Sequence, residues 1–396
     1  MPGLVGYRAD YAFDGERRLT DGALVLVRDG DIVAIEPGTA PAPVDCDVVY
    51  APGTTLLPGL IDTHVHLCAD SSSRALEQLP ELDPDRLAAI IDAALTSQLA
   101  AGVTAVRDLG DMQWAVVDQR ATPAGQPWIV ASGPPITSPG GHCANMGGAV
   151  EGRDAIIDAV RLRAERGADV VKVMTSGGIL TFGTDIEACN FTDDEVRLMV
   201  DEAHRRGLPI VAHAHALSAV QQSVSAGVDG IEHCSCFTGT GLEAPTELAV
   251  QMATTGVPVC PTVGWDPDEP FGPEIIAVME QFGLTIDDVR SHIARLHRAG
   301  VRLISGSDAG VSVAKPHGVL REAVIDLAES SIPADEALAS ATGRAADAIG
   351  LGDRTGRLRA GLAADLLIVD GNPMSDPTAL RNVRTVVARG RLVVTT

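Results

Sequence analysis

The sequence predicts an α/β protein built on a (β/α)8 TIM barrel, with a small β-sandwich formed by its N- and C-terminal segments. The middle of the chain repeats a helix-like segment, a glycine, a short β-branched run and a polar loop, a pattern typical of βα units on a parallel sheet. Eight such apolar runs occur, and eight strands close a barrel. Both ends of the chain instead alternate apolar and polar residues around turns.

The eight predicted barrel strands follow one another along residues 58–357. Most come directly after a glycine that is placed to end the preceding helix. In chain order they are LIDTHVH from Leu60, GVTAVRDLG from Gly102, PWIVASG from Pro127, GADVVKVMTSGG from Gly167, GLPIVAHAHA from Gly207, GVDGIEHC from Gly227, GVPVCPTV from Gly256 and GVRLISGSDAG from Gly300. One intervening helix, TDDEVRLMVDEAHRRG from Thr192, shows N-cap, dipole and C-cap signals together.

The predicted sandwich takes residues 1–57 and 358–396. ALVLVRDGDIVAIEPG, from Ala23, is typical of a hairpin with an Asp-Gly turn. GLAADLLIVDG, from Gly361, and VRTVVARGRLVV, from Val383, are strand-like runs at the other end of the chain. We therefore expect the two ends to pair with each other outside the barrel.

Composition restricts the class of partner. The formal net charge is -23, from 53 acidic and 30 basic residues, and such a negative field repels nucleic acid and anionic membranes. The seven cysteines are scattered and odd in number, which favours a reducing compartment over a disulfide framework. The N-terminus lacks the basic start and apolar run of a signal peptide. We expect a cytoplasmic protein that acts on a small molecule, with a homo-oligomer as the common state of such proteins.

Candidate metal ligands fall where barrel strands end, which is where active sites lie in this architecture. His64 and His66 are two residues apart in a strand, so both imidazoles share one face. His213 ends the fifth strand, His233 ends the sixth, and Asp308 follows the eighth. A structural histidine pair would explain His-Val-His alone, but not this whole set. Imidazole and carboxylate ligands together suit zinc and similar ions.

Lys172 and His142 are further candidates. Lys172 interrupts the apolar strand ADVVKVM, and a buried lysine must be paired, neutralised or modified. The alternative is an ordinary ion pair with a neighbouring carboxylate. His142 lies in a glycine-rich loop after the third strand, where its ring could approach a substrate; a loop histidine bonded to backbone is the equally weighted alternative.

Taken together, these residues resemble the amidohydrolase superfamily. The resemblance rests on PGLIDTHVH (58–66), Lys172, His213, His233 and GSDAG (306–310), in order and in strand placement. Stretches such as SPGGHCANMGG (138–148) are similar, more narrowly, to its imidazolonepropionase-like and Xaa-Pro dipeptidase group. The resemblance implies that Lys172 is carboxylated by CO2 and bridges two divalent metal ions, zinc being the expected one. The implied ligands are His64, His66 and Asp308 for one ion, and His213 and His233 for the other.

The reaction implied by the resemblance is hydrolysis of a linear amide by a metal-bridged hydroxide. The expected substrate is a dipeptide or an N-acyl amino acid with a free carboxylate. Asp308 would serve as general base and then as general acid. Many relatives carry Tyr two positions after His213, where this chain has His215. We assign His142 and His215 to binding the substrate carbonyl or carboxylate.

Two other functions remain open at this stage. A cyclic-amide or imidazolone hydrolase, or a deaminase, would use the same barrel and often one metal, although Lys172 favours two. A nonenzymatic barrel that binds a small molecule would be expected to have lost ligands, and none is missing. The remaining histidines and a Cys-x-Cys pair receive structural interpretations. His204, His292 and His297 are expected to face solvent or lie near helix C-termini, His317 to support the Asp308 loop, and Cys234 and Cys236 to pack in the core.

Overall fold

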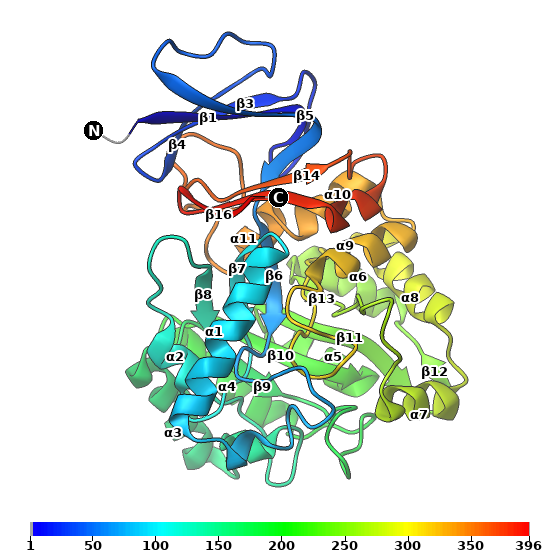
Figure 1. The fold of residues 1–396 in the computed structure, drawn as a ribbon. Helices are drawn as coiled ribbons and strands as arrows, with labels where there is room; N and C mark the ends of the chain where they lie inside the picture. Colours follow the sequence, from blue (N-terminus) through cyan, green and yellow to red (C-terminus); the bar gives the residue numbers. More distant parts are fainter. Residues whose placement is uncertain (1–2, 396) are drawn as a thin grey trace.

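A computed structural model describes residues 3–395. One sheet, at the top of Figure 1, contains both ends of the chain, and the parallel strands and most of the helices lie below it. No helix in the described range is long and apolar enough to cross a membrane.

The upper sheet is built from both ends of the chain and has eight strands. In spatial order these are β16 (Arg391–Thr395), β15 (Val383–Ala388), β14 (Leu366–Asp370), β5 (Cys46–Pro58), β1 (Leu4–Phe13), β3 (Ala23–Arg28) and β4 (Asp31–Glu36), with β2 (Arg18–Leu19) beside β1. The Asp-Gly turn predicted between β3 and β4 is present at residues 29–30. The predicted pairing of the two ends is confirmed, because Leu56 of β5 lies opposite Ile368 of β14.

The predicted sandwich is in fact one continuous sheet. Strand β5 is 13 residues long. Its first part pairs in parallel with β1 and its last part pairs antiparallel with β14, so a single strand joins both halves. Side chains from the two halves, including Tyr7, Val25 and Ile368, still share one buried core. The predicted domain boundaries near residues 57 and 358 stay predictions.

Seven of the eight predicted parallel strands form as regular strands, in two sheets. One sheet has the order β6 (Leu60–Val65), β7 (Val103–Asp108) and β8 (Trp128–Ala131). The other contains β9 (Val171–Met174), β10 (Ile210–Ala216) and β11 (Gly230–Thr238), with β13 (Val259–Cys260) and the antiparallel β12 (Gly241–Leu242) beside β11. Single bridges continue the pattern between Ile136 and Val173 and between Val65 and Ala309.

The eighth predicted strand, which starts at Gly300, does not form a regular strand: its 301–304 segment is joined to β13 by a bridge from Leu303 to Val259, and Ala309 is bridged to Val65. The Ile304 N–H donates to the Val259 carbonyl, but beyond this segment the Ser305 N–H donates to the Ser340 carbonyl and the Ser307 N–H donates to the Asp62 carboxylate. The regular parallel strands therefore form two separate sheets, and hydrogen-bonded bridges link these sheets to each other and to the 300–310 segment.

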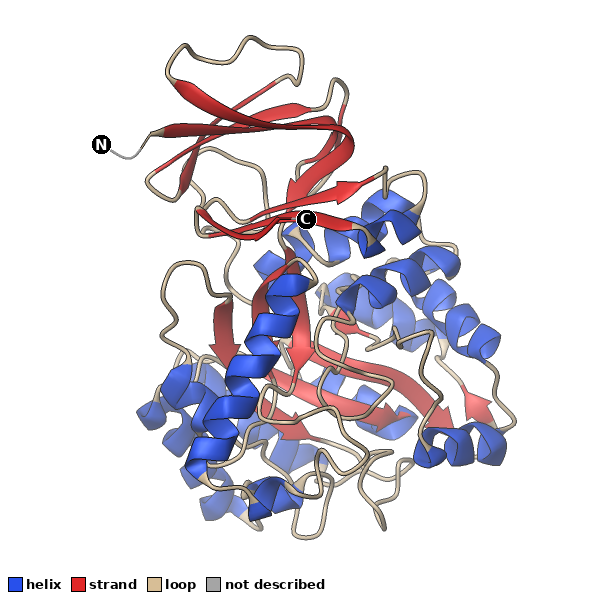
Figure 2. Ribbon diagram, in the orientation of Figure 1, coloured by secondary structure: helices blue, strands red, loops and turns tan. Residues whose placement is uncertain are grey.

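Helices surround these strands (Figure 2). They are α1 (Pro84–Ala100), α2 (Ala115–Gln119), α3 (Arg153–Arg166), α4 (Asp193–Arg205), α5 (Leu217–Ala226), α6 (Thr246–Thr255), α7 (Pro273–Phe282), α8 (Ile286–Arg298), α9 (Leu320–Glu329), α10 (Ala334–Ser340) and α11 (Gly343–Ala348). Helix α4 begins with the predicted capping signal, since Thr192 and Glu195 form a reciprocal capping box. Gly167 and Gly227 end α3 and α5 in the left-handed conformation, as the sequence predicts.

Candidate metal centre and active site

The structure brings all eight predicted site residues to one cavity. It is lined by His64, His66, His142, Lys172, His213, His215, His233 and Asp308, together with a largely apolar wall. The residues come from four strands, β6, β9, β10 and β11, and from the loops that follow β6, β8 and the 301–304 segment. Distant parts of the sequence therefore converge at the strand ends, as expected.

His64, His66 and Asp308 form the first group of possible metal ligands. The Nε2 atoms of His64 and His66 lie 3.4 and 3.2 Å from Oδ1 of Asp308. On the far side of each ring, Nδ1 of His64 lies 2.8 Å from the Glu232 carboxylate and Nδ1 of His66 lies 3.0 Å from the Gly110 carbonyl. If each Nδ1–H donates to these acceptors, both Nε2 atoms are left free to bind a cation, which is the usual support of a metal-binding histidine.

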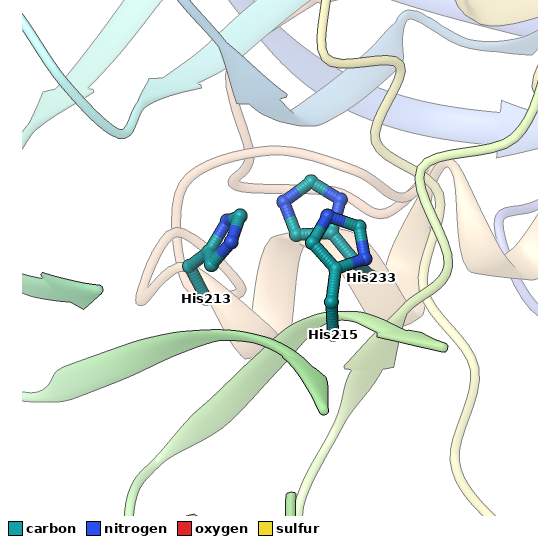
Figure 3. A group of neighbouring side chains, drawn as sticks. All are labelled: His213, His215 and His233. Carbon is teal, nitrogen blue, oxygen red and sulfur yellow. The ribbon is translucent and has the colours of Figure 1, made fainter. Parts of the chain in front are cut away.

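His213, His215 and His233 form the second group, with one ring nitrogen from each within 4.8 Å of the others. Figure 3 shows the three rings gathered above the ends of β10 and β11. The His215 and His233 rings are stacked, with centroids 4.5 Å apart. Nδ1 of His233 lies 2.7 Å from Oγ1 of Thr262, and Nε2 of His213 lies 3.0 Å from the Gly177 carbonyl. Each of these histidines thus has one nitrogen engaged and one available.

An unusual backbone conformation is concentrated at this site. His233 has φ 67° and Asp308 has φ 60°, and Cys143 and Thr262 also have positive φ. Non-glycine residues rarely adopt this conformation, and where they do the strain often marks a functional site. The turns reorient the chain at the strand ends where the two donor groups meet.

Lys172 lines the cavity and is 0% exposed. Its Nζ atom has no hydrogen-bond partner among the described residues, and no ion pair within 4.0 Å involves it there. Burial lowers the pKa of Lys172, while the charges of Glu232 and Asp308 oppose that shift. The ion-pair alternative is therefore wrong for this structure, and the lysine nitrogen is a buried polar atom that lacks a partner.

Burial keeps most of the histidines neutral. It lowers the pKa of His64 and of His215 to about 4, and that of His142 to about 3. The pKa values of His213 and His233 are also well below the usual range, through burial and the neighbouring imidazoles. Neutral imidazole is the form that binds metals.

Asp308 and His66 behave differently from the other buried groups. Burial alone would raise the pKa of Asp308, but the neighbouring His64 and His66 hold it well below its usual range. Burial lowers the pKa of His66, but the hydrogen bond to Asp308, the charges of Asp308 and Asp108 and the contact with the Gly110 carbonyl together outweigh burial and leave the pKa raised. Asp308 is thus a carboxylate at neutral pH, as a ligand or a proton acceptor must be.

His142 reaches the site from its loop. Its ring lies 4.7 Å from that of His213, and its Nδ1 lies 2.7 Å from Oγ1 of Thr181. The backbone-bonded alternative for His142 is not what the structure shows, because the partner is a side chain. His142 therefore faces the cavity beside the second donor group.

Glu232 and Arg107 are parts of the site that sequence reasoning missed. Glu232 is 0% exposed and joins His64 to Arg107, whose Nη2 donates to Oε1 at 2.8 Å. Burial raises the pKa of Glu232, but the charge of Arg107 and the hydrogen bond from His64 lower it to about 2. The signal was present in the sequence, since both residues interrupt apolar strands in the same way as Lys172.

Among the other histidines, His292 corrects a prediction. It is 3% exposed, not solvent-facing, and its Nε2 donates to the Cys234 carbonyl at 2.9 Å. His292 lies on the inner face of α8, and the many polar residues of that helix gave no sign in the sequence that this position is buried. His204 is exposed as expected, and His297 lies in the last turn of α8. The predicted packing of Cys234 and Cys236 is confirmed, because both are buried in the main core.

Comparison with known proteins now identifies the family. The sequence profile of the amidohydrolase family matches residues 55–393. The chain belongs to the amidohydrolase family. The predicted α/β amidohydrolase fold and the predicted class of enzyme, a hydrolase of carbon–nitrogen bonds, are confirmed with it.

Similar proteins support this assignment along the whole chain. A solved structure of a Xaa-Pro dipeptidase with methionine in its active site is 26% identical, with a TM-score of 0.85, and the match covers 98% of this chain and 99% of that one. Ochratoxinase of Aspergillus niger is 25% identical over 377 residues, which cover 84% of this chain and 73% of the relative. Imidazolonepropionase of Symbiobacterium thermophilum is 24% identical over 412 residues, covering 94% and 90%. These relatives confirm the predicted resemblance to the imidazolonepropionase-like and Xaa-Pro dipeptidase group of amidohydrolases.

Amidohydrolases generally use metal ions, and the donors present here fit them. Two groups of nitrogen and oxygen donors, most of them buried, line the cavity, together with a lysine nitrogen that has no partner among the described residues. Neutral imidazoles with a carboxylate are the ligand types that zinc and similar ions prefer.

Proposed function

We propose that the chain hydrolyses a linear amide bond, in a dipeptide of the Xaa-Pro kind or in an N-acyl amino acid, with two divalent metal ions. One observation carries the proposal: two groups of metal-type donors and Lys172, whose Nζ has no partner among the described residues, line a single cavity. A Xaa-Pro dipeptidase is among the similar structures.

In this proposal the donors hold two ions, zinc being the expected metal, at the strand ends of a (β/α)8 barrel. His64, His66 and Asp308 would hold one ion, and His213 and His233 the other. Lys172, carboxylated by CO2, would lie between them, because a carbamate turns a buried ammonium into an oxygen anion. When bound, such ions lower the pKa of a shared water and polarise the substrate carbonyl.

Asp308 is the proposed proton carrier. Its low pKa leaves it ionised, so it accepts a proton from the attacking water and later gives a proton to the leaving nitrogen. His142 and His215 face the same cavity and are placed to bind the substrate carbonyl or carboxylate. The 2.8 Å contact between His215 Nδ1 and Ser235 Oγ fixes the orientation of the His215 ring. The predicted cytoplasmic location and homo-oligomer stay predictions.

The test is hydrolysis of a panel of Xaa-Pro dipeptides and N-acetyl amino acids by protein loaded with zinc and bicarbonate. We expect cleavage of at least one linear amide, and a fall in kcat of about 100-fold or more for Asp308→Asn. The exposed Asp45 provides the control Asp45→Asn, which should keep full activity. Cleavage of cyclic amides or imidazolones alone would favour the imidazolonepropionase-like reaction, and turnover of neither class would contradict the proposal.

A further inference from the structure

Helix α7 has an apolar face that covers no core. Ile275, Val278, Met279 and Phe282 recur at the spacing of one helix face. All four are only partly buried, and no residue of α7 is fully buried. The apolar face of an amphipathic helix normally packs against a hydrophobic core. The face of α7 must therefore meet something other than the protein interior.

That face borders the active-site cavity. Ile275, Val278 and Met279 line it directly. The fourth residue, Phe282, stacks on Phe237 with ring centroids 4.9 Å apart, and the Phe237 ring lies 5.9 Å from that of His215. The apolar surface of α7 thus runs without interruption to the proposed reaction centre.

The rest of this wall is uncharged. Its further members include Leu180, Trp265 and Val289. Among residues 3–395, no arginine lines the cavity, and its two lysines are fully buried or engaged. Lys172 is fully buried, and Nζ of Lys315, 4.8 Å from the centre of the Trp265 ring, lies 2.7 Å from each of the Thr262 and Ser307 carbonyl oxygens. A charged group against α7 would have no counterion and would lose its hydration, which is costly.

We infer that α7 is the specificity wall of the enzyme, and that it receives a large, uncharged apolar substituent of the substrate beside the scissile amide. An aromatic or branched aliphatic side chain is the occupant that fits. This inference rests on the proposed function and goes beyond it, because it states which side chain a dipeptide or N-acyl amino acid must carry to be a good substrate. The free energy of burying the substituent favours such substrates over those with small or charged groups.

The first test compares substrates that differ in one side chain. Two series are used, Xaa-Pro dipeptides and N-acetyl amino acids, each with Phe, Leu, Gly or Asp at the variable position, so that either side of the amide can lie under α7. We expect kcat/KM for Phe and Leu to exceed that for Gly and Asp by about 10- to 100-fold in at least one series. Equal rates, or a preference for Asp, would overturn the inference.

The second test places a charge on each side of α7. Val278→Asp puts a carboxylate on the wall, whereas Ile276→Asp puts it on the outer face, where Ile276 is 43% exposed. We expect Val278→Asp to reduce kcat/KM for the Phe substrate by about 10-fold or more relative to kcat/KM for the Gly substrate. Ile276→Asp should keep the wild-type ratio of Phe to Gly. Circular dichroism checks that both variants fold, and equal behaviour of the two would contradict the assignment.

A binding measurement separates this inference from the proposed reaction. The probe is 4-phenyl-1-butanol, an uncharged apolar alcohol without a bond to hydrolyse, titrated by calorimetry. We expect it to bind the wild type and Ile276→Asp alike, and Val278→Asp about 10-fold more weakly. Binding with this pattern but no amide cleavage would support the role of α7 in binding apolar groups and would refute the proposed amide hydrolysis. Amide cleavage without binding of the alcohol, or with equal binding to all three proteins, would refute the role assigned to α7 and leave the proposed hydrolysis standing.

Discussion

Replacing Lys172 with methionine is expected to stabilise the protein without metal and to lose part or all of that advantage when metal is bound. Lys172 is 0% exposed, and its Nζ has no hydrogen-bond partner in the described structure. A buried cation without good partners costs several kcal/mol. Methionine has a similar length and no charge, so it removes that cost without leaving a large cavity.

The expected magnitude follows from comparable replacements. In protein freed of metal and bicarbonate, Lys172→Met should raise the free energy of unfolding by about 1–4 kcal/mol. With zinc and bicarbonate present at about 100 times the dissociation constant, binding stabilises the wild type by about 3 kcal/mol. The variant lacks the proposed bridging ligand and should gain much less. The difference in free energy of unfolding between Lys172→Met and the wild type should therefore shrink or change sign when zinc and bicarbonate are added.

The assay is urea unfolding followed by circular dichroism in both conditions. The control is Lys315→Met, which removes the other buried lysine of the cavity. Lys315 donates to backbone carbonyls, so its loss leaves these acceptors without a partner and should destabilise the protein with or without metal. The reasoning is refuted if Lys172→Met destabilises the metal-free protein as Lys315→Met does, or if it binds metal like the wild type.

Three further predictions concern the surroundings of the site. His215→Phe should lower kcat by about 100-fold, whereas His215→Tyr, which restores a donor, should keep more of the activity; equal losses would exclude a role in binding the carbonyl. Glu232→Gln should weaken metal binding by about 10- to 100-fold and lower the free energy of unfolding by about 3–5 kcal/mol, because Arg107 and His64 lose a buried partner; metal titration and urea unfolding measure the two effects. Burial lowers the pKa of His292 to about 4, below its unfolded value of about 6.5. The unfolded state therefore takes up a proton first, and this residue contributes stability that is complete above pH 6.5 and falls as the pH drops toward 4. Between pH 7 and pH 4, the free energy of unfolding of the wild type should fall by about 3 kcal/mol more than that of His292→Gln. An equal fall for both proteins, measured by urea unfolding, would contradict the assigned pKa.

The sequence predicted the residues of the site better than the shape of the sheets. Periodic glycines and short apolar runs marked the strands, and metal-type side chains at their ends could be found because such residues have no packing role there. His64, Lys172 and Asp308 thus converge as expected. Glu232 interrupts a strand in the same way but was not predicted, because it is not itself one of the expected metal ligands. Its carboxylate instead orients the ring of one ligand, His64.

Long-range pairing could not be predicted from local pattern. Alternating residues in β5 indicate a strand, but only tertiary contacts make this strand join β1 and β14 in one continuous sheet. The 301–304 segment has the composition of a strand, yet its neighbouring backbone groups bond to Ser340 and Asp62, which are distant in sequence. His292 lies on a helix with a polar average, and its burial depends on which face turns inward.

The most direct test of the proposed metal centre is the metal content of protein purified without chelator, measured by elemental analysis together with hydrolysis of the amide panel. The proposal predicts about two zinc-like ions per chain and cleavage of a linear amide. A content of about one ion would contradict the binuclear centre, and no metal even after reconstitution with zinc and bicarbonate would contradict a metal-dependent reaction.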